Sequence, residues 1–449
     1  MNKRKNSIII CLIIGLCFLW TGSGYLTWLY HLMAFYPSES VDFLTEVVGY
    51  LFQVCGLVIS AFMIKQRHAL FPLRSGFVTT VLCDFILIFL STLAQSGPLT
   101  LLFGYGMNLF HGLVAGYYLM LLVTDVPQQN RGIVFGLGYG VGSIGSWLLS
   151  LIGDGDFLQN RLVLIPYAIL IGGTVLLFCL RSHNEPEEEK ISGRPFNPAF
   201  LCLAAGTVFL LSLVKNLGFY FPSADLSESS VSLEFTRAFY AIGLITAGLI
   251  SDKNRRYSAI CCLAALVFPF ISLFLVKDLG ANTIVWIVSY IFFGFFTVFR
   301  VILFTDLAGK TEECLFLAGC GLLWGRAGDV VGAFIGMRLA EHTSLLILLV
   351  STLFILTVFV FFAFYHKLYV PNISAEQKQK TLLLTFEKQY DFSSRERDVF
   401  ELIVNGQSNS EIAGNLFISE NTVKFHIKNI LRKTQCANRT ELIRLFSQN

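Results

Sequence analysis

Long apolar stretches separated by short polar segments fill the first 366 residues of the chain. Twelve windows are nearly free of charge, and each approaches the ~20 residues that an α-helix needs to cross about 30 Å of hydrocarbon. They cover residues 7–29, 46–64, 76–94, 98–123, 132–152, 162–180, 199–217, 231–250, 257–276, 281–304, 315–337 and 343–366. The last is the clearest, because Ser344 to Phe364 holds no charged residue. The pattern predicts twelve membrane-spanning helices.

Composition narrows the class of protein. Hydrophobic residues make up 55% of the chain and charged residues 14%, with a mean hydropathy of +0.66. A soluble domain carries about 25% charged residues, so a soluble globular protein and a disordered chain are both excluded over most of the length. Ten of the eleven cysteines precede residue 321, mostly within apolar runs, and read as small hydrophobic side chains. We expect no enzyme, no metal and no other cofactor, because no metal-ligand cluster, phosphate-binding loop or nucleophile–base arrangement stands out.

Basic residues in the short polar segments predict the orientation. With the N-terminus in the cytoplasm, inner segments hold fourteen basic residues and outer segments hold four, namely Arg161, Lys215, Lys277 and Arg338. This excess on one side follows the positive-inside rule. Twelve spans then return the C-terminus to the cytoplasm. The early apolar run after Met1 is expected to be a retained span in a multi-pass protein of the cytoplasmic membrane.

A weak internal repeat divides the spans into two groups of six. A shift of 181 residues aligns six identities within nineteen positions, starting with Leu122 on Leu303 and Asp125 on Asp306. Chance matching within a biased composition is the alternative. The repeat predicts halves 1–180 and 199–366 of parallel topology, joined by a polar cytoplasmic loop 181–198.

A short motif in the second half supports this topology. Residues 248–256 read Gly-Leu-Ile-Ser-Asp-Lys-Asn-Arg-Arg. With the two six-helix halves, the segment resembles the G-x-x-x-D-[RK]-x-G-[RK]-[RK] loop of the major facilitator superfamily of transporters, although Asn254 replaces the glycine. The resemblance implies that Asp252, Lys253, Arg255 and Arg256 latch two helices on the cytoplasmic side. The alternative is that the three basic residues only set the topology.

Polar composition begins at Lys367 and marks a second part of the chain. Residues 367–391 are expected to be a cytoplasmic linker, partly helical, acting as a spacer or as a packing surface for a partner helix. In residues 392–449, helix-capping signals recur at Ser393, Ser408, Ser419 and Asn438. They predict four helices, of which the second and third form a helix-turn-helix.

The third of these helices has the character of a DNA-reading helix. Val423, Ile427 and Ile430 recur at helical spacing, and the opposite stripe carries basic residues without acidic ones. An α-helix fits the major groove, where lysine can donate hydrogen bonds to guanine. The alternative is a solvated basic face on an ordinary helical bundle.

The motifs of this domain resemble those of the LuxR-type DNA-binding domain. The matching segments are Ser394 to Phe400, Gly406 to Ala413 and Ile418 to Lys433. The resemblance implies that Lys424, Phe425 and Lys428 approach bases of double-stranded DNA, with Phe425 replacing a small residue. It also implies that Asn421, Thr422 and Lys433 lie near phosphates. Arg432 belongs to the basic stripe and is expected to bind DNA with them. The fourth helix is then a dimer surface, so a homodimer on a two-fold symmetric promoter site is expected.

The whole chain is therefore expected to be all-α: a polytopic membrane bundle of twelve spans, residues 1–366, followed by a four-helix domain at 392–449. Two functions remain open. One is a membrane-bound one-component transcriptional regulator, in which a transporter-like domain senses a small molecule and controls DNA binding. The other is an active secondary transporter that carries a regulatory DNA-binding tail.

Ionisable and polar residues deep in the spans locate a candidate ligand site, because charge at mid-membrane costs about 2.5–3.5 kcal/mol unless it is paired or faces a cavity. The candidates lie near mid-depth or toward the outer side: Asp84, Asn108, His111, Arg237, Arg326 and Asp329. The side chain of Arg300 is expected to reach the inner membrane interface, so its charge is not taken as evidence of a ligand site. The set favours a midplane cavity for a small ligand with an anionic or polar group, and an aromatic part is suggested by Trp20, Tyr25 and Trp28. A self-contained ion pair between Arg326 and Asp329 is the alternative.

Overall fold

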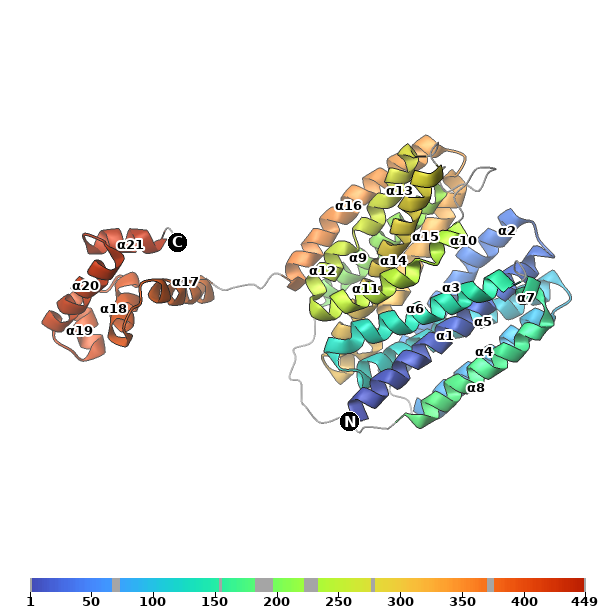
Figure 1. Cartoon of the computed structure of the whole chain (residues 1–449), viewed down its shortest axis with the longest axis horizontal. Coiled ribbons are helices and arrows are strands. Elements are labelled where there is room, and N and C mark those ends of the chain that lie inside the picture. The colour runs from blue at the N-terminus through green and yellow to red at the C-terminus, as the bar shows by residue number, and fades with distance from the viewer. Residues whose placement is uncertain are drawn as a thin grey trace. The chain divides into compact units, whose positions relative to one another are not determined.

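The computed structural model describes residues 2–66, 73–152, 156–181, 197–221, 233–275, 279–369 and 375–447. Every regular element within these residues is helical, which confirms the all-α prediction. The chain divides into two compact units, residues 1–369 and 370–449, called here the membrane unit and the C-terminal unit (Figure 1). The expected central loop falls almost wholly on residues 182–196, outside the described residues.

The first half of the membrane unit has five long helices and a composite second span. Its helices are α1 Asn2–Met33, α2 Ser38–Asp42, α3 Tyr50–Gln66, α4 Leu73–Leu93, α5 Gly97–Asp125, α6 Arg131–Leu151, α7 Asp156–Gln159 and α8 Leu164–Leu180. Between α2 and α3, the π-helical segment η1 Phe43–Gly49 widens the second span. Such segments are rare and occur often at functional sites.

The second half follows the same order. Its helices are α9 Pro198–Leu217, α10 Leu233–Arg237, α11 Tyr240–Lys253, α12 Arg255–Cys261, α13 Ala264–Phe274, α14 Leu279–Ala308, α15 Cys320–Leu339 and α16 Thr343–Tyr369. The repeated Asp125 and Asp306 lie at or near the ends of α5 and α14. The repeated glycines lie in α6 and at the start of α15. These equivalent positions are those that the internal repeat predicts.

Eleven helices in the described residues are long and apolar enough to cross a membrane. The eighth expected span, 231–250, differs because it is broken: α10 ends at Arg237, and α11 begins at Tyr240 after a two-residue turn. A break at membrane depth is tolerated where it faces protein or lines a cavity. Arg237 does line the central cavity described below.

Among the helices that join the halves, α6 packs along α11 and α3 packs along α15. The α6–α11 contact is close: a Cβ atom added to Gly248 would lie 2.5 Å from the carbonyl oxygen of Gly132. The glycine-rich fifth span is therefore a tightly packed helix, as its composition predicts.

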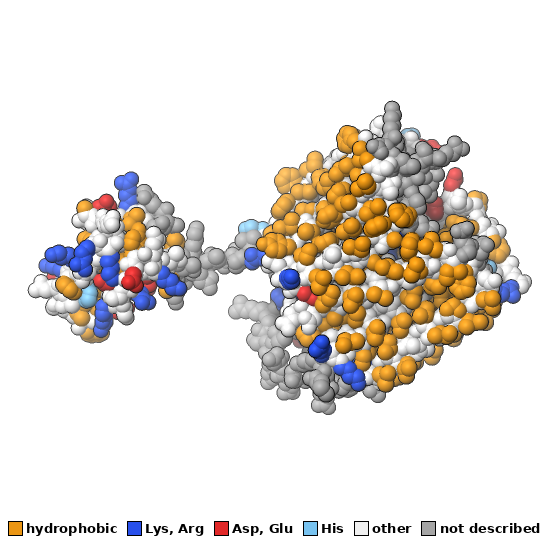
Figure 2. Space-filling view, in the orientation of Figure 1, with side chains coloured by type: hydrophobic (Ala, Val, Ile, Leu, Met, Phe, Trp, Pro, Cys, Tyr) orange, Lys and Arg blue, Asp and Glu red, His pale blue; other side chains and the backbone are white. Residues whose placement is uncertain are grey.

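The outer surface of the membrane unit is apolar. Hydrophobic side chains cover most of the face shown in Figure 2. Large ones are widely exposed, among them Ile169 at 69%, Leu348 at 64% and Phe359 at 72%. A soluble protein does not expose such a continuous surface, and lipid is the solvent that fits it.

The C-terminal unit contains five helices around its own core. They are α17 Ala375–Gln389, α18 Ser394–Val404, α19 Asn409–Leu416, α20 Glu420–Thr434 and α21 Arg439–Ser447. The last four match the predicted four-helix domain. Helix α17 differs from a simple spacer, because its Leu383 and Phe386 are buried in the same core as Phe400. Residues 370–374 of the expected linker lie outside the described residues.

Candidate functional site

A cavity of about 360 Å³ lies between the two halves of the membrane unit. Its wall comes from both halves, including α1, α3, α5 and α6 of the first and α9, α11, α14 and α15 of the second. Nine aromatic residues line it: Phe18, Tyr25, Tyr50, Tyr118, Tyr139, Phe219, Tyr240, Tyr290 and Phe293. The volume falls in the usual range for small-molecule sites, roughly 300–1,000 Å³.

Asp329 is the polar centre of this cavity. Its Oδ1 accepts a hydrogen bond from Ser212 Oγ at 2.7 Å and lies 3.1 Å from Lys215 Nζ. Its Oδ2 lies 3.6 Å from Arg326 Nη1 and 3.8 Å from Arg300 Nη1. One carboxylate thus faces three cations, so Arg326 and Asp329 do not form a self-contained pair.

Lys215 and Arg300 correct the sequence interpretation. Lys215 had been assigned to an outer loop, but it lies within α9 with its side chain 16% exposed. Arg300 had been expected to reach the inner interface, but it is 4% exposed and lines the cavity. Depth along a helix did not reveal which way these side chains point. The signal that could have found them is a lone cation beside apolar helical neighbours.

Of the six expected ligand residues, four line the cavity: His111, Arg237, Arg326 and Asp329. The other two lie behind its wall. Asp84 is fully buried, with its Oδ1 3.5 Å from His111 Nε2. The side-chain amide oxygen of Asn108 accepts a hydrogen bond at 2.9 Å from Gln53, which itself lines the cavity. Asn108 therefore orients Gln53, whereas Asp84 lies near His111 without a hydrogen bond between them.

A further contact joins the halves at the broken and π-helical region. Tyr220, which follows α9, donates a hydrogen bond from its hydroxyl to Glu46 Oε2 of η1 at 3.2 Å. Sequence reasoning missed Glu46, because it stands at the very start of the predicted second span.

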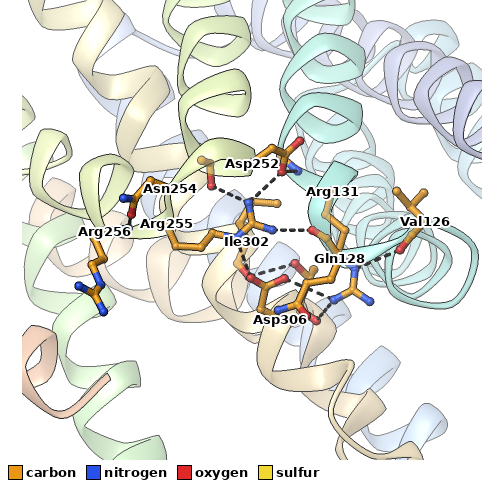
Figure 3. A network of polar contacts seen from close by, with 12 residues as sticks. Val126, Gln128, Arg131, Asp252, Asn254, Arg255, Arg256, Ile302 and Asp306 are labelled. Atoms are coloured by element: carbon orange, nitrogen blue, oxygen red, sulfur yellow. Dashed lines mark hydrogen bonds and ion pairs between the residues drawn. The ribbon is translucent and has the colours of Figure 1, made fainter. Parts of the chain in front are cut away.

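A polar network ties the halves together at the end of the membrane unit that holds the expected latch motif (Figure 3). Asp252 of α11 accepts hydrogen bonds from the backbone nitrogens of Gly132 and Ile133, at 2.8 and 2.7 Å. It therefore satisfies free N–H groups at the N-terminus of α6, where a negative charge is favoured. Arg255 donates to Asp252 and to Asp306, both at 2.8 Å.

Arg131 extends the network from the first half. Its guanidinium donates to the Thr305 carbonyl at 2.9 Å and lies 3.4 Å from Asp306. Arg255 reaches back to the Gln128 carbonyl at 2.6 Å. The expected latch residues Asp252 and Arg255 are thus in the network, whereas Lys253 and Arg256 are exposed beside it. Arg131 and Asp306 are additions, although the sequence repeat had already singled out Asp306.

A second, smaller cavity of about 190 Å³ adjoins this network. Arg255 and Asp306 form part of its wall, and so do Leu368 and Tyr369. The latter two are the last residues of α16, directly before the chain leaves the membrane unit. The network and the exit of the chain therefore share one pocket.

In the C-terminal unit, α20 presents the expected basic stripe. Val423 and Ile430 are buried in the core, while Lys424, Lys428 and Arg432 are exposed. Phe425 is 61% exposed on the same stripe. Asn421 is exposed and Thr422 is partly buried at the start of the helix, where Ser419 caps it by accepting from the Thr422 nitrogen at 3.2 Å.

Lys433 has a partner within the protein. Its Nζ donates to Glu396 Oε2 at 2.7 Å and to the Asp391 carbonyl at 2.6 Å. Burial by itself would raise the pKa of the Glu396 carboxyl, but hydrogen bonds from Lys433 and Ser393 outweigh it and hold that pKa below its ordinary value. Lys433 thus joins α20 to the start of α18, and it differs from the free basic residues of the stripe.

Local signals explain why these helices form. Ser393 with Glu396 and Ser408 with Glu411 each make a complete capping box. At the start of α21, the Asn438 side chain accepts a hydrogen bond from the Glu441 nitrogen at 2.9 Å. Between α19 and α20, Phe417 adopts a left-handed conformation with φ of 54°. This residue ends α19 and turns the chain into α20, which gives the helix-turn-helix.

Comparisons with known proteins agree with both units. Residues 391–446 match the family described as "Bacterial regulatory proteins, luxR family". The chain is 54% identical over 55 residues to the uncharacterized transcriptional regulatory protein YhcZ of Bacillus subtilis (strain 168), covering 12% of this chain and 26% of that protein. It is 41% identical over 58 residues to the spore germination protein GerE of the same strain, covering 13% and 78%.

A third relative is the CsgBAC operon transcriptional regulatory protein of Escherichia coli (strain K12), 37% identical over 81 residues, covering 16% of this chain and 38% of that protein. The chain therefore spans well under half the length of YhcZ and of the CsgBAC regulator. Among solved structures, the nucleoside transporter NupG, solved as a point mutant, matches with a TM-score of 0.52 and 13% identity. That match covers 80% of this chain and 99% of the transporter, and it shows a shared fold.

Proposed function

Through its C-terminal unit the chain belongs to the luxR family of bacterial regulatory proteins, and we propose that it is a membrane-bound one-component transcriptional regulator. In this proposal the membrane unit senses a small molecule and controls DNA binding by the C-terminal unit. The observation that carries it is the joining, in one chain, of a transporter-like fold with a large polar cavity and a luxR-type domain.

DNA binding rests on α20. The helix would enter the major groove with Lys424, Phe425 and Lys428 toward base edges, and with Asn421, Thr422 and Arg432 toward the backbone. Lys433 stands at the edge of this surface, because Glu396 shares its charge. The C-terminal domain 392–449 carries eight basic and six acidic residues, so its non-specific attraction to DNA is weak. Specific binding then calls for a homodimer on a two-fold symmetric site, with α21 as the dimer surface.

Sensing requires that the ligand bind one arrangement of the two halves better than another. The central cavity has walls from both halves, so a bound ligand changes the free energy of moving one half against the other. The network holds the halves together at one end, because Asp252 accepts from the Gly132 nitrogen and Arg255 donates to the Gln128 carbonyl. It is the element that such a movement would break.

The signal would leave the membrane unit through the end of α16. Leu368 and Tyr369 share a pocket with Arg255 and Asp306, so breaking the network changes the surroundings of the last helical turn before residue 370. In this proposal both termini are cytoplasmic, which places the C-terminal unit on the same side as the chromosome and as this network.

The test compares two adjacent arginines in the full-length chain. We expect Arg255→Gln to change transcription of the target promoter several-fold, because Arg255 joins Asp252 and Asp306 of the second half to the Gln128 carbonyl of the first. Arg256→Gln is the matched control, because Arg256 is exposed and its side chain lies outside the network. The isolated residues 370–449, which contain neither arginine, give the promoter binding of the C-terminal unit without the membrane unit. Equal transcription with both variants would contradict control by the membrane unit.

The second candidate function is a secondary transporter that carries a regulatory DNA-binding tail. The observation in its favour is the fold match to a nucleoside transporter. Proteoliposomes containing the full-length chain should be tested with a radiolabelled nucleoside, with ligand binding measured beside uptake. A sensor binds without concentrating the solute inside the vesicles, whereas concentrative uptake would establish the transporter.

A further inference from the structure

The central cavity carries a surplus of positive charge. Lys215, Arg237, Arg300 and Arg326 line it, and Asp329 is the carboxylate among the lining residues. Two more carboxylates lie behind the wall: Glu46 beside Tyr220, and Asp84 beside His111. Even with both of these ionised, four cations face three carboxylates among these described residues. A neutral or cationic ligand would leave the surplus uncompensated.

Arg300 has unused donors at this place. The residue is 4% exposed, yet its Nε and Nη1 atoms make no hydrogen bond within the described residues. Nη1 lies 3.8 Å from Asp329 Oδ2, which is too long for a hydrogen bond. Buried guanidinium nitrogens without acceptors are costly, and an oxyanion that accepts from them would remove that cost.

The rest of the wall favours a planar apolar body. Nine aromatic rings line the cavity, and Arg326 lies over the Tyr50 ring at 4.3 Å from its centroid. Lys215 Nζ lies 5.9 Å from the ring centroids of Phe219 and Phe293. The cations therefore stand between aromatic faces and Asp329, so a ligand that reaches them must pack its remaining surface against rings.

We propose that the central cavity binds a small organic anion with an aromatic ring, whose carboxylate or phosphate group lies against Arg300, Arg326 and Lys215. The anion competes with Asp329 for these cations, and the ring packs among the tyrosines and phenylalanines. This proposal names the ligand class of the proposed sensor and rests on that function only for its effect on transcription.

The first experiment needs no substitution. The full-length chain in lipid nanodiscs is titrated calorimetrically with benzoate, phenyl phosphate, benzamide, benzylammonium and acetate. Benzoate or phenyl phosphate should bind about tenfold or more tightly than benzamide, because buried hydrogen bonds to charged groups are lost in the neutral compound. Comparing the two anions separates carboxylate from phosphate as the acidic group. Acetate should bind weakly, since it has no ring.

Four outcomes would overturn the proposal. Equal binding of benzamide and benzoate would show that the negative charge of the ligand does not contribute. Tighter binding of benzylammonium would show that the cavity prefers a cation. Acetate binding as tightly as benzoate removes the role of the rings. Absence of binding by all five probes at millimolar concentration rejects the ligand class.

Substitutions of the cavity residues then test the proposal, because the arginine variants and the Asp329 variant should change anion affinity in opposite directions. Arg300→Gln and Arg326→Gln should each weaken the binding of the anionic probe about tenfold or more. Arg338→Gln is the matched control, because Arg338 lies on the same helix as Arg326 but does not line the cavity. Asp329→Asn should strengthen binding, since it removes the competing carboxylate. Weaker binding in all three cavity variants, with unchanged Arg338→Gln, would mean that the cluster only supports the fold and would overturn the assignment.

A transcription reporter separates this inference from the proposed function. If benzoate binds through Arg300 and Arg326 but no ligand of the class alters transcription, the ligand class stands and the sensor function fails. If transcription responds to a neutral or cationic compound that binds the chain while benzoate does not bind, the sensor stands and this inference fails.

Discussion

Lys424 and Lys428 lie one helical turn apart on the exposed stripe of α20, and neither forms an ion pair within the described residues. We predict that Lys424→Ala with Lys428→Ala abolishes sequence-specific binding by residues 370–449. Each good base contact contributes about 1–3 kcal/mol, so the pair accounts for roughly a 10²- to 10⁴-fold loss. Promoter footprinting measures it, with Lys388→Ala and Arg395→Ala together as the charge-matched control. A wild-type footprint from the α20 variant would show that another helix reads the DNA.

The ionised carboxyl of Glu396 makes the stability of the C-terminal unit depend on pH. Its carboxyl accepts from Lys433 and from the Ser393 nitrogen, and its pKa lies below the ordinary value of 4.5. A carboxyl whose pKa is lowered by folding stabilises the fold above the ordinary value, and this contribution disappears as pH falls through the lowered pKa. We predict that Glu396→Gln destabilises residues 370–449 by about 1 kcal/mol at pH 7. Urea unfolding should show this difference shrink as pH falls below 4.5 and disappear below the lowered pKa. A difference that stays constant through the acidic range would contradict the role of the ionised carboxyl.

At the scale of elements, α17 belongs to the DNA-binding unit. The ring of Phe386 stacks on Phe400 with centroids 5.1 Å apart and meets the edge of Phe446 at 5.5 Å. We predict that Phe386→Ala destabilises residues 370–449 by about 3–5 kcal/mol, the usual cost of removing a buried aromatic ring. Leu384→Ala, on the same helix but 50% exposed, should change stability by less than about 0.5 kcal/mol. Equal effects in urea unfolding would mean that α17 is a free spacer.

The α6–α11 pair makes a second prediction at this scale. A Cβ atom at Gly248 would lie 2.5 Å from the backbone of Gly132, next to the atoms that Asp252 binds. Gly248→Ala should therefore force the helices apart, weaken the network and change transcription in the same direction as Arg255→Gln. Gly206→Ala is the matched control, because nothing lies within 4 Å of its added Cβ. Opposite directions for Gly248→Ala and Arg255→Gln would separate helix packing from the network.

For the whole molecule, the orientation in the membrane is the first property to test. We predict that a reporter active only in the cytoplasm works when it is fused after Asn449 or after Arg194, and fails when it is inserted near Ser227. The reason is the excess of basic residues in the segments on one side of the spans. An active reporter near Ser227 would contradict the arrangement of twelve spans with both termini inside.

The sequence by itself determined the properties that depend on near neighbours. The hydrocarbon thickness sets the length of a span, so apolar windows were enough to place eleven continuous helices and to find the interrupted eighth. The helix-turn-helix could also be predicted from the sequence, because helix caps such as Ser393 with Glu396 act within one turn. Only fine features escaped this reading, such as the break after Arg237 and the π-helical segment.

Tertiary structure decided which side chains meet. Lys215, Arg300 and Asp329 come from three helices, and their side chains converge because each helix is rotated about its axis by its own packing. Sequence depth places a residue along a span but leaves that rotation open, which is why Arg300 was misjudged. The same holds for Arg131 with Asp306, 175 positions apart, and for α17, whose apolar face finds its core only in the folded C-terminal unit.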